Sequence, residues 1–226
     1  ADFTGGFIQI NTKDIPVRNT LSLALGGNWN DATCFRNFKH ADHSSSFPND
    51  GNVGLLGSGL LNDWRVKTKT PIADIKASAD WSHKWHINGM SVGMVGTLNY
   101  TSETRTYKDM QNNLFGVYDI TNDRSNYLRN STDNQYNDNK RLGALLNLAL
   151  LSKSGNNKYE LKNIFNRIDN NRYTDRSGVN AQSDNEIGAE YYYRSRTTTN
   201  TQLTGKHTLP HDLLEWDLSY SYANRR

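Results

Sequence analysis

The sequence contains few of the residues on which several protein classes depend. It has one cysteine, Cys34, so no disulfide bond within the chain can stabilise the fold. No apolar run approaches about 18 residues, which excludes a transmembrane helix. The net charge is only +3, with 26 basic residues scattered among 23 acidic ones, and this excludes the basic stripe of a nucleic-acid-binding domain. Proline (4) and methionine (3) are also scarce, which suits strands joined by polar loops.

What the sequence does contain is a long alternation of apolar and polar residues between Ile72 and Ile87. Side chains alternate across a strand, so this segment predicts one strand with an apolar face and a charged face. The strand is longer than the usual five or six residues. One face carries Ala73, Ile75, Ala77, Ala79, Trp81, Trp85 and Ile87, interrupted by His83, and the other carries Asp74, Lys76, Ser78, Asp80, Ser82, Lys84 and His86.

The same alternation recurs along the chain and predicts about seven strands in all. A mean hydropathy of −0.81 does not exclude a membrane barrel, because only alternate residues of its strands face lipid. The further segments are Thr20–Trp29, Met90–Tyr100, Leu142–Leu150, Tyr159–Phe165, Glu186–Lys206 and Leu214–Tyr222.

The connections between these segments alternate in length, which favours an outer-membrane barrel with long outer loops and short periplasmic turns. A soluble β-sandwich also alternates apolar and polar residues, but long loops are uncommon in compact domains. The first strand would then run outward from the periplasm. The long connections are Asn30–Pro71, Thr106–Asn139 and Asp169–Asn185, and the tight ones are His86–Gly89, Lys153–Asn157 and Leu209–Asp212.

Two short stretches carry a resemblance to a known family. Residues 1–13 read ADFTGGFIQINTK, and residues 203–209 read LTGKHTL, followed by Trp216 and the run SYSYANRR. The first stretch resembles the last plug strand of TonB-dependent outer-membrane receptors, with Gly5, Gly6, Thr12 and Lys13 at the motif positions. The second is similar to a periplasmic hairpin and the following strand in members of that family from Bacteroidota.

This resemblance implies an all-β fold, an antiparallel transmembrane β-barrel fragment with about seven strands of a 22-stranded barrel. Residues 1–16 would be the last plug strand and linker, and residues 17–226 the N-terminal part of the barrel. Seven strands cannot close a barrel, so we expect the chain to be a fragment of a longer protein.

The implied function is part of a receptor that imports a scarce nutrient, such as a metal chelate, oligosaccharide or peptide, across the outer membrane of a Gram-negative bacterium. The implied partners are outer-membrane lipid and lipopolysaccharide, the TonB complex through a segment before Ala1, and a surface lipoprotein or other envelope proteins. The alternative is a structural barrel component of an envelope assembly that transports nothing itself, and a soluble sandwich that binds a ligand is a third possibility.

Charged residues on the polar parity of two predicted strands are candidates for the barrel lumen. They could contact a substrate, or they could bond to the plug and to neighbouring strands. These lumen-facing candidates are Asp74, Lys76, Asp80, Lys84, Glu186, Glu190 and Arg194, with Arg196 beside them.

Aromatic residues on the apolar parity are candidates for the interfacial belts of a barrel, rather than for sugar-binding platforms. Cys34, His40 and His43 match no metal-site spacing, so we expect an ordinary loop, no metal and no cofactor. No catalytic triad or carboxylate pair has a recognisable context, and we expect no enzyme. The interfacial aromatics are Trp29, Trp81, Trp85, Tyr100 and Trp216, with Tyr159.

Overall fold

The computed structural model describes residues 15–41, 65–180 and 182–225, and there the chain forms nine strands connected by turns and loops. In these residues no helix is long and apolar enough to cross a membrane. The strands are β1 (Thr20–Asn28), β2 (Phe38–Ala41), β3 (Val66–Lys69), β4 (Asp74–Ile87), β5 (Met90–Asp119), β6 (Arg124–Leu151), β7 (Asn157–Asn180), β8 (Asn185–Thr208) and β9 (Leu213–Arg225).

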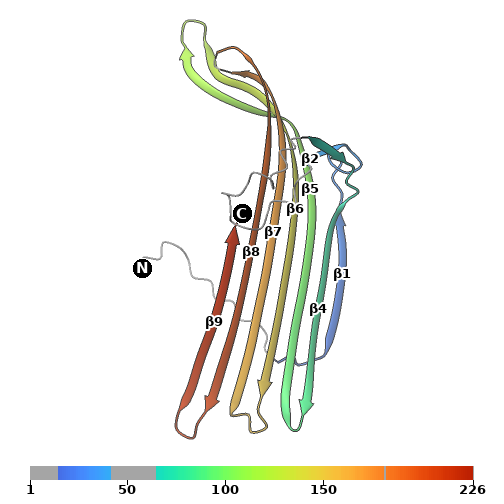
Figure 1. Ribbon diagram of the computed structural model, residues 1–226, viewed down its shortest axis with the longest axis vertical. Coiled ribbons are helices and arrows are strands. Elements are labelled where there is room, and N and C mark those ends of the chain that lie inside the picture. The colour runs from blue at the N-terminus through green and yellow to red at the C-terminus, as the bar shows by residue number, and fades with distance from the viewer. Residues whose placement is uncertain (1–14, 42–64, 181, 226) are drawn as a thin grey trace, which may run out of the picture.

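Seven of the strands form one antiparallel sheet in the order β1-β4-β5-β6-β7-β8-β9, and β2 pairs with β3 in a small second sheet. Each strand of the large sheet lies beside its neighbour in the chain, apart from the β2–β3 excursion between β1 and β4 (Figure 1). The sheet does not close within the described residues, because β1 and β9 are its two edges. The expected all-β fold with about seven antiparallel strands is therefore confirmed.

The pairing register gives the sheet two faces that differ in chemistry. Residues opposite each other on paired strands share a face. One continuous row of such partners contains Trp85, Val92, Leu150, Tyr159, Gly205 and Trp216. We call the face that carries this row the apolar face. The other face, which we call the polar face, carries Lys84, Gly93, Ala149, Glu160, Thr204 and Asp217 in the next row.

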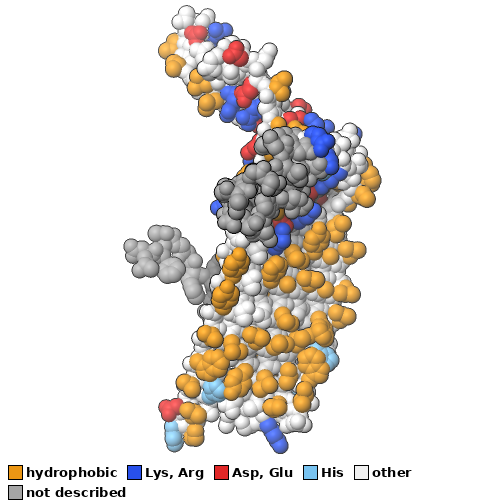
Figure 2. Space-filling model, in the orientation of Figure 1, with side chains coloured by type: hydrophobic (Ala, Val, Ile, Leu, Met, Phe, Trp, Pro, Cys, Tyr) orange, Lys and Arg blue, Asp and Glu red, His pale blue; other side chains and the backbone are white. Residues whose placement is uncertain are grey.

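The apolar face is open to its surroundings along the lower part of the sheet. Figure 2 shows hydrophobic side chains spread over this part, with charged side chains confined to its lower margin and to the region above. Leu21 on β1 and Leu218 on β9 are 69% and 67% exposed, although both are large and apolar. An exposed apolar area of this extent on a monomer marks a surface that contacts lipid or another protein.

The strands β5 to β8 are much longer than the sequence predicts, and two of the expected long loops do not exist. These strands contain 30, 28, 24 and 24 residues. The segments Thr106–Asn139 and Asp169–Asn185 are two hairpins that continue the ladder beyond the end of β4. We call residues 104–119, 124–138, 171–180 and 185–193 the upper extensions.

The prediction of loops failed there because the upper extensions are rich in Asn, Asp, Arg, Ser and Thr on both faces. Backbone hydrogen bonds hold a ladder whatever the side chains are, so strands can continue where most residues on both faces are polar. A bulge between Tyr107 and Met110 bends β5, with Asp109 at φ 55°, and Figure 1 shows the β5–β6 hairpin curving away at its upper end.

The tight turns lie where the sequence places them. Asn88 and Gly89 have φ angles of 50° and 81°, which is the geometry that favours Asn-Gly in a two-residue hairpin. The upper end of β5 is joined to β6 by a turn through residues 120–123. The Asp119 carboxylate accepts hydrogen bonds in this turn from the backbone N–H groups of Thr121 and Asn122. That cap explains how a polar segment turns without glycine.

The first long connection, Asn30–Pro71, is retained, and its described parts pack on the upper extensions. Phe38 on β2 is 1% exposed and lies edge-on to Tyr136 at 5.5 Å between ring centroids, and Tyr173 completes the cluster. Two ion pairs flank the cluster, Lys39–Asp175 at 2.7 Å and Lys69–Asp138. Tyr136 and Tyr173 have the same parity as the apolar face. The connection therefore covers the upward continuation of that face.

Candidate functional site on the polar face

The seven predicted lumen-facing residues all lie on the polar face, but they do not form one site. The register places Asp74, Lys76, Asp80 and Lys84 on the same parity as Glu186, Glu190 and Arg194. Lys84 lies near the lower end of β4, whereas Glu186 lies near the upper end of β8. The face is therefore best described as three levels.

At the lower level, the charged side chains of β7, β8 and β9 neutralise one another. Glu160 pairs with Lys158 and with Lys162, the latter at 2.9 Å, and Lys206 pairs with Glu215 at 2.5 Å. These groups border a shallow cavity of about 370 Å³. Each of these three lysines has a carboxylate partner, so they offer little uncompensated charge to an ionic ligand.

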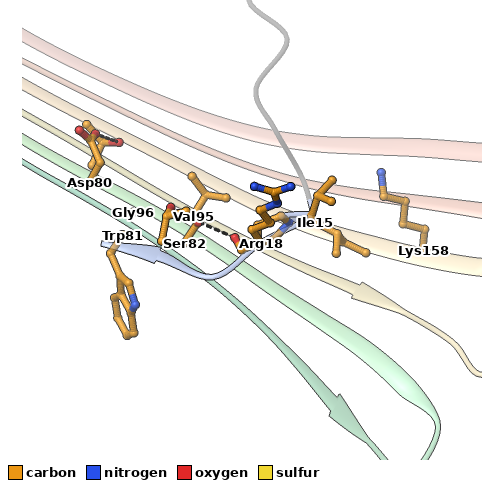
Figure 3. Close-up of a pocket in the computed structure, with 12 residues that line it drawn as sticks. Ile15, Arg18, Asp80, Trp81, Ser82, Val95, Gly96 and Lys158 are labelled. Atoms are coloured by element: carbon orange, nitrogen blue, oxygen red, sulfur yellow. Dashed lines mark hydrogen bonds between the residues drawn. The ribbon is translucent and has the colours of Figure 1, made fainter. Parts of the chain in front are cut away.

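A larger cavity of about 790 Å³ lies between the segment before β1 and the polar faces of β4 and β5. Asp80 accepts a hydrogen bond from the Thr97 hydroxyl at 2.9 Å, and the Ser82 hydroxyl donates to the backbone carbonyl of Arg18 at 3.1 Å. Figure 3 shows Ile15 and Arg18 on one side of this space and Trp81 directed away from it. The cavity is a place where chain that precedes β1 rests against the sheet.

At the middle level, Asp74 is buried and does not face open space. Its carboxylate accepts hydrogen bonds from the backbone N–H of Thr104 at 2.9 Å and from the Arg105 guanidinium at 2.5 Å. The hydrogen bond to Asp74 raises the pKa of Arg105 above its usual value. Lys76 lies 4.0 Å from Glu103. Asp74 therefore fixes the junction between β4 and the upper extension of β5.

The upper level holds a polar cavity of about 380 Å³. The Arg172 guanidinium donates to both oxygens of Glu190, at 3.0 and 3.1 Å. The guanidinium carbons of Arg172 and Arg194 lie 4.6 and 5.9 Å from the centre of the Tyr192 ring. Amides, guanidinium groups and a phenol together favour a hydroxylated or anionic small ligand. The lining includes Asn137, Asn139, Asn170, Arg172, Tyr192 and Arg194.

Of the residues that line this cavity, the sequence analysis named only Arg194, together with Glu190, the hydrogen-bond partner of Arg172. Asn137, Asn139 and Asn170 lie in segments that were expected to be loops, so their shared parity had no meaning until the strands were seen to continue. The spacing Asn137-x-Asn139 on β6 is the one signal in the sequence that could have indicated a polar strand face.

Higher on the same face, Asp133 is a buried carboxylate held by a bidentate arginine. Arg176 donates to its two oxygens at 2.7 and 2.8 Å, and the Asn112 amide donates at 2.8 Å. The hydrogen bonds from Arg176 hold the pKa of Asp133 below its usual value. This cluster ties β5, β6 and β7 together above the cavity.

On the apolar face, three of the predicted interfacial aromatics share a lower row, and Tyr100 lies alone in an upper one. Trp85, Tyr159 and Trp216 share the lower row, and Tyr100 lies in the row of Ala77. Eight residues of β4 separate the two rows, which is about 26 Å along the strand. Trp81 lies midway between these rows. Trp29 follows β1 and contacts Phe35 at 5.0 Å between ring centroids.

The lower row contains a ring cluster that depends on a glycine. The Trp216 indole N–H donates to His207 at 3.1 Å, and its ring lies 6.5 Å from that of Tyr159. A Cβ atom at Gly205 would meet the Trp216 ring at 2.3 Å. Glycine at this position therefore lets the indole lie across β8 toward Tyr159.

The remaining predicted sites add no chemistry. Gly5, Gly6, Thr12, Lys13 and His43 lie outside the described residues. Cys34 is buried, with its sulfur 3.3 Å from the backbone nitrogen of Asn30, and His40 lies on β2. Among the residues described, no three His, Cys, Asp or Glu side chains gather to hold a metal ion.

Comparison with known proteins identifies no relative: no family model, no curated protein and no solved structure matches this chain.

Proposed function

We propose that this chain forms part of the wall of a TonB-dependent outer-membrane receptor that imports a scarce nutrient. The observation that carries the proposal is the exposed apolar face, with Trp85, Tyr159 and Trp216 in its lower row and Tyr100 about 26 Å above that row along the strands. An apolar band of about 25 Å between aromatic girdles is typical of outer-membrane barrels. The resemblance of residues 1–13 and 203–209 to receptor motifs supplies the family.

In this arrangement the two edges of the sheet would pair with further strands, toward the 22 of that family. Unpaired backbone groups on β1 and β9 are costly in lipid, so closure by more strands removes that cost. The polar face would then line the lumen, and residues 1–16 would belong to the plug and its linker. A nutrient such as a metal chelate, oligosaccharide or peptide would pass between plug and wall.

The upper extensions would project on the outer side of the membrane, and the tight turns would lie in the periplasm. The outward-facing partners are then lipid and lipopolysaccharide along the apolar face, and a surface lipoprotein or other envelope protein above it. The TonB complex would act from the periplasm through a segment that precedes Ala1. This orientation follows from the short turns at Asn88 and at Leu209–Asp212.

Membrane fractionation of cells that produce the native protein tests the location. We expect it in the outer-membrane fraction, extracted by detergent and retained after washing with high salt or alkaline carbonate. Recovery in the soluble periplasmic fraction would overturn the proposal and favour a soluble β-sandwich.

Transport is tested separately by removing the TonB-binding segment from the native protein. The receptor proposal expects loss of growth on the imported nutrient, supplied as the sole source. If growth is unaffected on metal chelates, oligosaccharides and peptides alike, the protein is a structural barrel component instead.

A further inference from the structure

We propose that the polar face carries an anion-binding site formed by Arg141, Arg172, Arg194 and Arg196. This inference rests on the proposed function and names the class of ligand that the wall would capture. The ligand is a small hydroxylated solute that bears a carboxylate or a phosphate group. We call the four residues the arginine cluster.

The register brings these arginines together from three adjacent strands. Arg141 on β6 and Arg196 on β8 lie in one row, on either side of Ile168 of β7. Their backbones are therefore about 10 Å apart, two strand spacings. Arg194 lies two residues further along β8, and Arg172 of β7 pairs with Tyr192 in the row after that.

The cluster has more positive charge than its surroundings balance. Glu190 accepts two hydrogen bonds from Arg172 and one from the Thr174 hydroxyl at 3.5 Å. The other nearby carboxylates are engaged elsewhere, Asp74 by Arg105 and Glu103 beside Lys76. In the described parts of the chain, Arg141, Arg194 and Arg196 form no ion pair.

Two of these guanidinium groups also have an unused donor. Nε of Arg172 and Nε of Arg194 are buried atoms without a hydrogen-bond partner. A buried donor without a partner costs about 1–3 kcal/mol. Both arginines line the polar cavity of about 380 Å³. A ligand anion in this cavity would supply the missing acceptors.

The neighbouring side chains define the rest of the ligand. A guanidinium group binds a carboxylate or a phosphate through two parallel hydrogen bonds. Asn137, Asn139 and Asn170 add amides that donate to and accept from hydroxyl groups. The guanidinium groups of Arg172 and Arg194 lie near the Tyr192 ring. They occupy the space in which a neutral sugar would stack on that ring. The site therefore favours an acidic sugar or sugar phosphate over a neutral sugar.

The test measures binding to the native protein in detergent micelles by equilibrium dialysis. The probes are glucuronate, glucose 6-phosphate and glucose, which share a ring and differ in charge. We expect both anions to bind at least about tenfold more tightly than glucose, since hydrogen bonds to charged groups are each worth that factor or more. Binding of one anion without the other identifies the group that the site selects.

The variant Arg196→Gln removes one charge from an exposed side chain that has no ion-pair partner. Because no ion pair is lost, we expect the variant to fold as the unaltered protein does. We expect it to weaken anion binding about tenfold and to leave glucose binding unchanged. Lys206→Gln is the matched control, because it removes one positive charge from the same face of the same strand, at the lower level. It should bind the anions as the unaltered protein does.

Equal affinity for glucose and the two anions would overturn the inference. Unchanged anion binding by both Arg196→Gln and the double variant Arg194→Gln/Arg196→Gln would also overturn it. Membrane fractionation separates this failure from failure of the proposed function. A protein that fractionates with the outer membrane but binds no anion contradicts only the ligand class, whereas a soluble protein contradicts the barrel itself.

Discussion

The lower part of the sheet and the upper extensions share one backbone ladder but differ in what covers their faces. In the lower part, the apolar parity is exposed and consists of residues such as Leu23, Leu98 and Leu146. In the upper extensions, the same parity carries Tyr136, Tyr173 and Tyr191, and Phe38 covers the first two. The polar parity changes far less between the two regions.

The comparison shows that the side chains on the apolar parity indicate what lies against that face of the sheet. Where it is apolar and uncovered, the lower strands present a surface suited to contact with lipid or with another protein. Where it is aromatic and covered, the extensions depend on packing from the chain's own first connection and on ion pairs such as Lys39–Asp175 and Arg176–Asp133. The two regions should therefore respond to different substitutions.

The largest expected effect is in the upper region, on replacing Phe38 by alanine. Phe38 is the most buried large side chain in the described core, and loss of a buried phenylalanine costs about 3–5 kcal/mol. The first connection should then detach from the tyrosines. Cys34 is buried and lies four residues before Phe38, in the same connection. Its rate of reaction with a maleimide therefore reports detachment of the connection. We expect labelling at least about a hundredfold faster.

Phe115→Ala is the control for that experiment, because Phe115 is 55% exposed and contacts Tyr127 at the far end of the β5–β6 hairpin. Its labelling rate should equal that of the unaltered protein. If Phe38→Ala also leaves the rate unchanged, the covered face does not hold the first connection.

A somewhat smaller effect is expected in the lower region, on replacing Leu146 by arginine. Leu146 lies in the row of Trp81, midway between the row of Trp85 and the row of Tyr100. A lipid-facing arginine at the middle of a barrel wall costs about 2–4 kcal/mol. Folding into lipid vesicles, followed by the gel shift of unheated protein, should show a smaller folded fraction. Thr132→Arg, on the same parity of β6 in the upper extension, should fold normally. Equal folding of both variants would remove the distinction between the regions.

The smallest of the three effects concerns Asp133 and acid. Its pKa is lowered in the fold by the hydrogen bonds from Arg176, so its contribution to stability is complete above the unfolded pKa of about 3.9. That contribution is lost as the pH falls below this value and through the lower folded pKa. The hydrogen-exchange protection of amides 130–134 should therefore decrease in acid.

Asp133→Asn should lower that protection near neutral pH by about 1–3 kcal/mol, because it weakens a partly buried charged pair, and should abolish its acid dependence. Asp184→Asn, at an exposed turn, is the control and should keep the acid dependence. An acid response that survives in Asp133→Asn would assign it to another carboxylate.

Alternation predicted the strands where one face is apolar along most of its length and missed them where most residues on both faces are polar. The segments containing Leu21, Trp81 and Leu146 were located correctly because large apolar residues recur there at every second position. Asn137, Asn170 and Arg172 lie on strands as regular as those, yet apart from the spacing Asn137-x-Asn139 their local pattern does not separate a polar strand from a polar loop. The polar cavity was missed for that reason, although Arg194 on its border and Glu190, which pairs with Arg172, were found.

The sequence by itself determined the faces of the lower sheet, the tight turns and the number of strands in the large sheet. These properties follow from local side-chain alternation and from turn residues such as Asn88 and Gly89. Only the tertiary structure decided how far β5 to β8 extend, where Phe38 packs, and that Arg141, Arg172, Arg194 and Arg196 lie together. Each of these depends on the register between strands, and hydrogen-bonded pairing fixes that register across residues far apart in the chain.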